Sequence, residues 1–330
     1  MKTTRREFVT LAAGAIAGVS ARARAADSPP AAGRYDGPII DTHQHLWDLD
    51  KLRLPWLDGK LKRNFLPRDY DQAAAGLKIV KAVYMEVAVA DEDKAKEARL
   101  ILEQCRQRET VTVAAVVGGR LQDAGFREYL SPFQDDANLK GLRQIVPAPK
   151  GRPELYADKT FISHVRRLGE LGLRFDLCPP PTGLGDALAL VEACGDTRFV
   201  LDHVGNAHPK AFAAGVAGTA TKPPHDADQW RRGIDRLAGK KNVVCKISGI
   251  VARCEPDKWT PSDLAPAINH CLDAFGPDRA MFASDWPVCT RAATLRQWVE
   301  ALKEIVACRP ADQQRKLFHD NAAAFYGLAR

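Results

Sequence analysis

Two histidines stand one residue apart at the end of an apolar run in the segment IIDTHQHLWD, residues 39–48. In a β-strand, side chains alternate between the two faces, so His43 and His45 should point to the same side. Two imidazoles directed together from a strand end are suited to hold a metal ion or to bind a substrate. Each histidine taken alone could instead be a packing residue. The polar residues on the other strands are therefore needed to distinguish these roles.

Polar residues also end most of the other apolar runs that we expect to be strands. Burying such side chains without partners is costly, so several of them at one rim indicate a site. His203 and Asp285 are the strongest partners for the histidine pair. By strand parity, His203 should face the site, whereas Asp202 should face the opposite way and support it or cap a helix. Weaker candidates are Glu86, Arg143, Asp176, Lys246, Ser248 and Ser284.

Several of these side chains have two readings. Glu86 and Arg143 could pair with each other as a structural salt bridge, or they could contact a substrate, in which case Arg143 favours an acidic or hydroxylated ligand. Trp47 and Trp286, with Trp56, could stack on the face of a sugar or pack in the core.

The elements that must position these residues alternate along the chain. Eight apolar runs are separated by amphipathic helical segments, and they span 38–44, 80–87, 111–117, 139–146, 173–178, 198–204, 242–248 and 279–285. Mostly continuous apolar strands are typical of a parallel sheet covered on both faces. The alternation predicts the α/β class and a single-domain (β/α)8 TIM barrel, residues 37–328, with its active site at the C-terminal ends of the strands. A doubly wound sheet is the alternative, but no Gly-rich nucleotide fingerprint follows the first strand.

The N-terminus predicts an export signal. Arg5 and Arg6 precede a mildly apolar stretch, and an A-x-A site follows at residues 23–25. The paired arginines resemble the signals that the bacterial Tat export machinery reads, so we expect residues 1–25 to be a Tat-type signal peptide and the mature chain to be periplasmic. An ordinary Sec signal is the alternative. Residues 26–36 are expected to form a flexible lead-in.

Charge and cysteine content narrow the function classes. The chain has 330 residues and a net charge of +7, of which the segment 1–25 carries +4. The rest has acids and bases interspersed, without a basic stripe, so nucleic acid is not an expected partner. No run in the mature part is long enough to span a membrane. None of the eight cysteines forms a C-x-x-C pair, and most are expected to be buried thiols. A homodimer is the default expectation.

The motifs DTHQHLWD, YMEV, GLRQIV, LDHVGN, CKISG and FASDWPV resemble the amidohydrolase superfamily. More narrowly, they are similar to the amidohydrolase-related group (amidohydrolase 2) that includes L-fuconolactonase, other sugar lactonases and pyrone-dicarboxylate lactonases. The likeness spans about residues 38–328 and implies a (β/α)8 barrel that hydrolyses a small cyclic ester. It implies Glu86 and Arg143 as metal-site or substrate contacts. The central catalytic set that it implies is His43, His45, His203 and Asp285.

The resemblance leaves the role of a metal open. Binuclear members of the superfamily place a carboxylated lysine on the fourth strand and a histidine on the fifth, whereas this chain offers Arg143 and Asp176 there. A two-metal centre is therefore not expected. In both open mechanisms Asp285 is the general base. The histidines either hold one divalent ion such as Zn²⁺ together with Asp285, or bind the substrate directly with Arg143 and without metal.

Two other functions stay open. Relatives on this barrel include metal-dependent decarboxylases of aromatic acids, which use a similar set of histidine and aspartate residues. A non-catalytic binding protein of the cell envelope is the second alternative, although a pure binder has less need of a base such as Asp285. The residues after His203 read Gly205, Asn206 and Ala207, where the narrower group often has Gly-Lys-Pro, so the resemblance does not identify the lactone.

Overall fold

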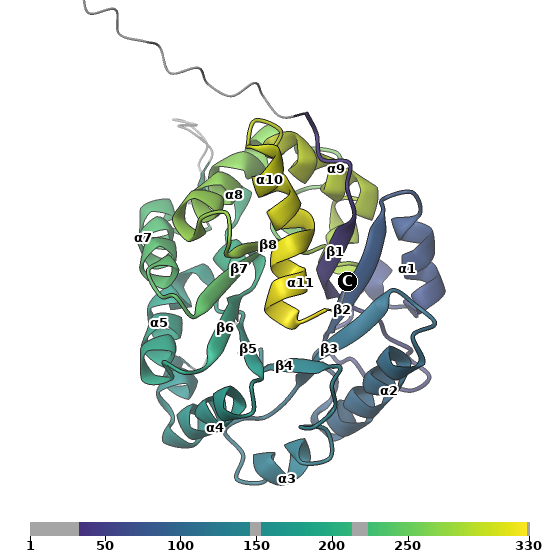
Figure 1. Ribbon diagram of the computed structural model, residues 1–330, viewed down its shortest axis with the longest axis vertical. Helices are drawn as coiled ribbons and strands as arrows, with labels where there is room; N and C mark the ends of the chain where they lie inside the picture. The colour runs from purple at the N-terminus through teal and green to yellow at the C-terminus, as the bar shows by residue number, and fades with distance from the viewer. Residues whose placement is uncertain (1–32, 146–152, 213–223, 329–330) are drawn as a thin grey trace, which may run out of the picture. The chain divides into compact units, whose positions relative to one another are not determined.

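A computed structural model of the chain describes residues 33–145, 153–212 and 224–328. The predicted signal peptide and most of the predicted lead-in lie outside these residues. Within them, eight parallel strands follow one another in chain order around one sheet (Figure 1). The strands are β1 (Ile39–Gln44), β2 (Ile79–Met85), β3 (Thr112–Gly118), β4 (Leu139–Arg143), β5 (Arg174–Leu177), β6 (Arg198–Leu201), β7 (Val243–Ile247) and β8 (Ala280–Phe282).

Helices lie around the outside of this ring, so the single-domain (β/α)8 barrel is confirmed for the described residues. The longer helices are α1 (Pro67–Ala74), α2 (Lys94–Gln107), α4 (Lys159–Glu170), α5 (Leu184–Ala193), α7 (Ala227–Ala238), α8 (Pro261–Phe275) and α9 (Leu295–Ile305). Shorter ones are α3 (Phe126–Leu130), α6 (His203–Asn206), α10 (Ala311–Arg315) and α11 (Asn321–Tyr326). Short 3-10 turns include η2 (Asp91–Asp93), η6 (Val251–Arg253) and η7 (Val288–Arg291). Among these helices, none is both long and apolar enough to cross a membrane.

The interior of the barrel is a packed apolar cluster rather than a channel. Inward-facing strand residues such as Ile40, Val116 and Met281 are buried there. Helix α11 lies over the middle of the ring in Figure 1 and adds Phe325 and Tyr326 to the same cluster. Burying these side chains is the main favourable term for the fold. We call this cluster, with Phe325 and Tyr326 of α11, the apolar plug. It closes one end of the barrel, and the polar residues lie at the other end.

The ring closes between β8 and β1 without a regular ladder. Two backbone hydrogen bonds cross this seam, from Asp285 N to His43 O at 2.9 Å and from His45 N to Trp286 O at 2.7 Å. Both bonds involve residues predicted for the site. Closure of the barrel therefore sets Asp285 directly beside the two histidines.

A buried carboxylate braces the same seam. Asp41 Oδ1 accepts hydrogen bonds from the backbone N–H groups of His43 (3.1 Å) and Ser284 (2.8 Å), and its Oδ2 accepts one from the Tyr70 hydroxyl (2.7 Å). Burial raises the pKa of Asp41. The brace ties β1 to the segment after β8, where backbone donors would otherwise be unpaired.

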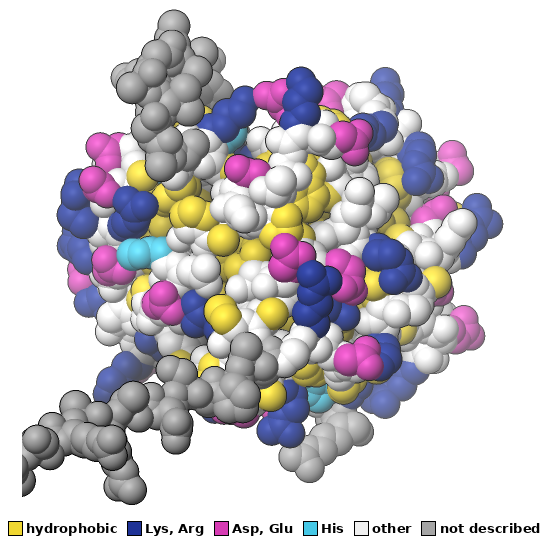
Figure 2. Space-filling model, turned by 90° about the horizontal axis from the view of Figure 1, so that it is seen from above, with side chains coloured by type: hydrophobic (Ala, Val, Ile, Leu, Met, Phe, Trp, Pro, Cys, Tyr) yellow, Lys and Arg dark blue, Asp and Glu magenta, His cyan; other side chains and the backbone are white. Residues whose placement is uncertain are grey.

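The structure also bears on the predictions for the cysteines and for the surface charge. All eight cysteines are free thiols, and five of them are buried. Figure 2 shows Lys and Arg side chains intermingled with Asp and Glu over the face seen there, as the interspersed charges of the sequence predict.

Candidate active site

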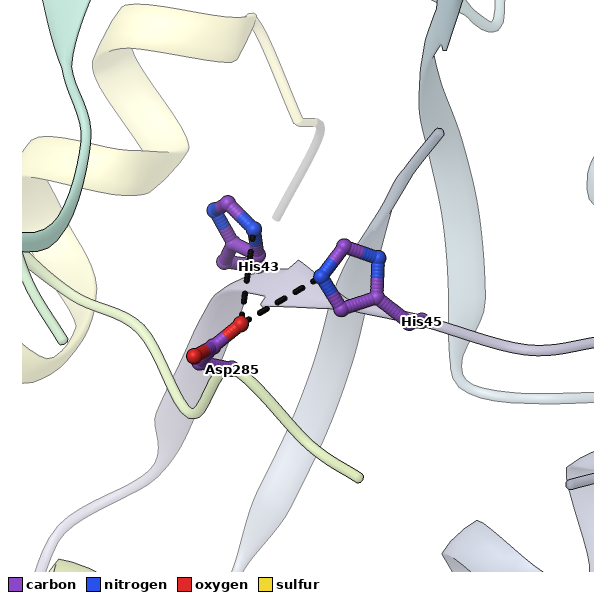
Figure 3. Close-up of side chains that lie close together, drawn as sticks. All are labelled: His43, His45 and Asp285. Atoms are coloured by element: carbon purple, nitrogen blue, oxygen red, sulfur yellow. Dashed lines mark ion pairs between the residues drawn. The ribbon is translucent and has the colours of Figure 1, made fainter. Parts of the chain in front are cut away.

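Three imidazoles surround one carboxylate oxygen at the C-terminal end of the barrel. Asp285 Oδ1 lies 3.3 Å from His45 Nε2, 3.8 Å from His43 Nε2 and 3.9 Å from His203 Nε2. Figure 3 shows the first two histidines and Asp285 pointing toward one another from β1 and from the segment after β8. All four side chains are buried. The structure thus brings together the central set that the sequence predicts.

The partners of the histidines indicate where each ring carries its proton. His45 Nδ1 lies 2.9 Å from the carbonyl oxygen of Met85, which can only accept, so we assign a proton to Nδ1. In the neutral ring, the lone pair of Nε2 then faces Asp285 Oδ1 across 3.3 Å. A lone pair and a carboxylate repel each other at this distance unless a cation lies between them. A proton or a metal ion would satisfy both groups.

His43 has a comparable arrangement. Its Nδ1 lies 3.3 Å from Asp202 Oδ1, and the Arg143 guanidinium approaches its Nε2 at 3.3 Å as a donor. A proton on Nδ1 and a lone pair on Nε2 satisfy both neighbours. Burial lowers the pKa of His43 well below its usual value, so the ring is neutral near pH 7. Burial alone would raise the pKa of Asp285, but the surrounding imidazoles lower it when they share a proton or another cation with the carboxylate, which is then the ionised partner.

His203 reaches the cluster from a left-handed turn. Strand β6 ends at Leu201, and residues 203, 204, 205 and 206 have φ of 57°, 47°, 61° and 56°. This conformation is costly for residues other than glycine, and most of all for a β-branched residue such as Val204. Three of these four consecutive residues are not glycine, which indicates that the surrounding packing imposes the turn. The turn directs His203 at Asp285.

The same turn overturns the parity prediction for Asp202. The sequence predicts that Asp202 and His203 face opposite ways, but strand alternation stops at Leu201 and both side chains turn inward. Asp202 is fully buried and contacts His43, Arg143 and Lys246. It occupies the N-cap position of α6 without a side-chain capping bond. Its direct ion-pair contact is therefore with His43, and His203 lies further from it in the same cluster.

The two residues that follow β7 fix the ring of His203. Ser248 Oγ lies 2.9 Å from His203 Nδ1. Gly249 follows with φ of +68°, and a Cβ placed on it would lie 2.5 Å from His203 Cγ. No side chain fits there without moving the imidazole. Burial lowers the pKa of His203, so this ring is also neutral near pH 7.

A buried charge network lies beneath the histidines. Arg143 donates from Nε to Glu86 Oε1 at 2.7 Å and from one terminal nitrogen to Asp202 Oδ2 at 3.2 Å. Lys246 Nζ lies 2.6 Å from Asp176 Oδ2 and 3.3 Å from Asp202 Oδ1. With Asp285, four buried carboxyl groups face two cations. Burial raises the pKa of Asp176 to about 7, so this carboxyl group is only partly charged near neutral pH. The remaining excess of acid still favours an additional cation in the cluster above.

A cavity of about 600 Å³ opens above the cluster. His45, His203, Asp285 and Arg143 line it, and Trp56 contributes an apolar wall. The remaining residues predicted to contact a substrate are not in its lining. Glu86 is held by Arg143. Trp47 packs against Phe65 and donates to Arg63 O, and Trp286 packs against Phe65 and Tyr70.

Sequence reasoning missed three features of this cavity. Arg253 and Gly249 line it after β7, and Asp41 braces the seam that forms its floor. Asp41 opens the DTHQH motif, and Gly249 ends CKISG, so these motifs contained both residues without showing what they contact. Arg253 has no such signal, because it lies beyond the strand in a loop without periodicity.

Comparisons with known proteins identify the family. The family model described as Amidohydrolase matches residues 40–328. The L-fucono-1,5-lactonase of Burkholderia multivorans is 28% identical over 298 residues, which cover 88% of this chain and 96% of that protein. A crystal structure of an amidohydrolase from Burkholderia multivorans with bound zinc is 26% identical, with a TM-score of 0.76, and the match covers 88% of this chain and 100% of that one.

A more distant structure supports the fold alone. The probable 2-pyrone-4,6-dicarboxylic acid hydrolase from Acinetobacter baumannii is 16% identical, with a TM-score of 0.67, over 88% of this chain and 99% of that one. The family model covers nearly the whole described barrel and includes every residue of the histidine and aspartate cluster. The chain therefore belongs to the amidohydrolase family of enzymes.

Proposed function

We propose that the chain is a lactonase that hydrolyses a small cyclic ester in the 600 Å³ cavity. The observation that carries the proposal is the position of Asp285 in the lining of this cavity, with its Oδ1 within 3.9 Å of three imidazoles. The similarity to a protein named L-fucono-1,5-lactonase supports the reaction class.

Asp285 acts as the general base. It accepts a proton from the attacking water as the water oxygen bonds to the lactone carbonyl carbon. When the ring C–O bond breaks, the same carboxyl group returns the proton to the departing alkoxide, which yields a hydroxy acid. His203 Nε2 can donate to the carbonyl oxygen when the Ser248 hydroxyl donates to Nδ1. Gly249 and the left-handed turn hold that ring in place.

The cluster also fits one divalent ion. Ligand atoms of His43, His45 and Asp285 lie within 4.8 Å of one another, and the lone pair of His45 faces the carboxylate. To bind the ion, His43 Nε2 would give up its 3.3 Å contact with Arg143. When bound, such an ion would polarise the lactone carbonyl and lower the pKa of a water molecule. We propose Zn²⁺, because imidazole and carboxylate suit it and a similar amidohydrolase carries zinc.

A second ion is not part of the proposal. The other group of potential ligands in the described residues, His43, Asp202 and His203, shares His43 with the first. Asp202 is already paired with Arg143 and Lys246. Two ions would have to share one imidazole and displace two buried cations.

The variant Asp285→Asn tests both the role of Asp285 as general base and the single-ion site. Because it keeps the shape of the side chain but removes the base, it should lower lactone hydrolysis by about 10³-fold or more, measured as proton release on a panel of sugar lactones. Its circular dichroism should stay unchanged. Metal analysis should find at most one equivalent in the wild type and less in the variant.

The control is Asp228→Asn on the exposed surface of α7, which should behave as the wild type. Wild-type rates in Asp285→Asn would refute the mechanism. Release of carbon dioxide from aromatic acids, with no lactone hydrolysed, would refute the reaction class. Two tightly bound metal equivalents would refute the single-ion site.

A further inference from the structure

One wall of the cavity carries an arginine that a buried amide holds in place. Arg253 ends η6, lines the cavity, and donates from one terminal nitrogen to Asn206 Oδ1 at 2.6 Å. Asn206 is itself buried and donates to the carbonyl oxygen of Pro179 at 2.8 Å. This anchoring orders one end of the guanidinium and leaves its other N–H groups available to a ligand.

The charge of Arg253 has no carboxylate partner among the described residues. The other cations of the cavity wall each have one: Arg143 pairs with Glu86 at 2.7 Å, Lys94 with Asp91 at 3.4 Å, and Arg291 with Asp58 at 3.3 Å. Glu255, two residues beyond Arg253, is bound to Lys210 at 2.7 Å and Lys258 at 3.2 Å. Among the cations of the cavity wall in the described residues, Arg253 is therefore the one without a salt bridge, and its guanidinium faces the same cavity as the carboxylate of Asp285.

The opposite wall is mainly apolar, apart from the ion pair of Lys94 with Asp91. The cavity is lined beside the end of β2 by Trp56, Val87 and Val89. The indole N–H of Trp56 donates a hydrogen bond to the carbonyl oxygen of Val87 at 2.6 Å, so it is not available to a ligand. Asn206 follows β6, and β2 and β6 lie on opposite sides of the eight-stranded ring. A ligand between these walls would place a ring face against the tryptophan and an anionic group toward the guanidinium.

We propose that Arg253 selects lactones that carry a carboxylate outside the ring, so that the enzyme prefers acidic sugar lactones to neutral ones. The inference rests on the proposed lactonase function and adds the charge of the substrate. Arg253 binds the free carboxylate in a charge-assisted pair, and Asn206 holds the guanidinium toward it. The reacting carbonyl lies over Asp285, away from the bound acid.

Two matched substrate pairs test this preference. D-Glucono-1,4-lactone and D-glucaro-1,4-lactone differ only in a terminal hydroxymethyl or carboxylate group, and so do the galactono and galactaro lactones. We expect the wild type to have the higher kcat/KM for the acidic member of at least one pair. Arg253→Gln should lower kcat/KM for that acid by about 10- to 100-fold while changing its neutral partner by less than about threefold. Arg253→Lys should restore part of the loss.

Lys258→Gln is the control, because it removes the same charge from the same loop at an exposed position outside the cavity. It should leave the acid-to-neutral ratio unchanged. Calorimetry on the wild type should show D-glucarate or D-galactarate binding more tightly than its aldonate, and Arg253→Gln should abolish that difference.

The possible failures are distinct. Hydrolysis of the neutral members equal to or faster than the acids in both pairs would overturn the charge preference and leave the lactonase intact. Equal losses on acid and neutral lactones in Arg253→Gln would overturn the role of Arg253. If no lactone of any charge is hydrolysed, the lactonase proposal fails, and this inference fails with it.

Discussion

At the scale of single residues, the site depends on atoms that never touch a substrate. Gly249 is the sharpest case, because a Cβ on it would lie 2.5 Å from Cγ and 2.6 Å from Nδ1 of His203. Gly249→Ala should push the imidazole away from Asp285 and Ser248. We expect kcat to fall by about 10²-fold, since small misplacements of catalytic groups have effects of this size.

Gly172→Ala is the matched control. Gly172 has φ of +70°, close to the +68° of Gly249, but nothing lies within 4 Å of a Cβ placed there. Both variants share the cost of a left-handed alanine, about 1–2 kcal/mol. The difference between them in kcat and in urea unfolding isolates the contact with His203. Equal activities in the two variants would show that His203 tolerates the shift.

At the scale of elements, hydrophobicity predicts where strands run but not where their polar ends point. Each barrel strand is buried on both faces and therefore appears in the sequence as an apolar run. All eight strands could be predicted for this reason. The pairing of His43 with His45 also follows from strand alternation, which continues from β1 into the residue after it. Alternation fails at Asp202 because the left-handed turn follows Leu201, and the packing that imposes this turn comes from distant segments.

Helix α2 illustrates how an outer element reaches the site. Its buried Glu97 accepts from the backbone N–H of Val87 at 2.8 Å and from the Tyr84 hydroxyl at 2.9 Å, beside Glu86. Burial and Glu86 raise the pKa of Glu97 to about 7. The folded state therefore binds this proton more tightly than the unfolded state does. Its stabilising contribution is complete below the unfolded pKa, near 4.5, and is lost as the pH rises to about 7.

Glu97→Gln should remove this pH dependence, because the amide keeps an acceptor for both donors without a charge beside Glu86. We expect the variant to exceed the wild type in free energy of unfolding by about 1–3 kcal/mol at pH 8 and to match it at pH 4.5 or below. Urea unfolding at the two pH values is the measurement. Glu103→Gln, exposed on the same helix, should show no such pH-dependent gain. A constant difference at both pH values would contradict the shifted pKa.

At the scale of the whole molecule, the barrel separates chemistry from stability along its axis. The cluster around Asp285 occupies the C-terminal ends of the strands, and the apolar plug of α11 closes the other end. Phe325 packs in that plug with the Arg198 guanidinium 4.3 Å from its ring centroid. The plug contributes no residue to the cavity of the proposed active site. Substitutions at the two ends should therefore have separable effects.

Phe325→Ala should lower the free energy of unfolding by about 3–5 kcal/mol, because it removes a buried ring and leaves a cavity. Its kcat/KM at 25 °C should stay within about twofold of the wild type as long as the chain is folded, since no catalytic contact changes. If that variant does not fold, Phe325→Leu should show a loss of about 1 kcal/mol with the same unchanged activity. Gly249→Ala should give the reverse pattern, with a large loss of kcat and a small loss of stability. A parallel fall of activity and stability in a folded plug variant would show that the two ends of the barrel are coupled.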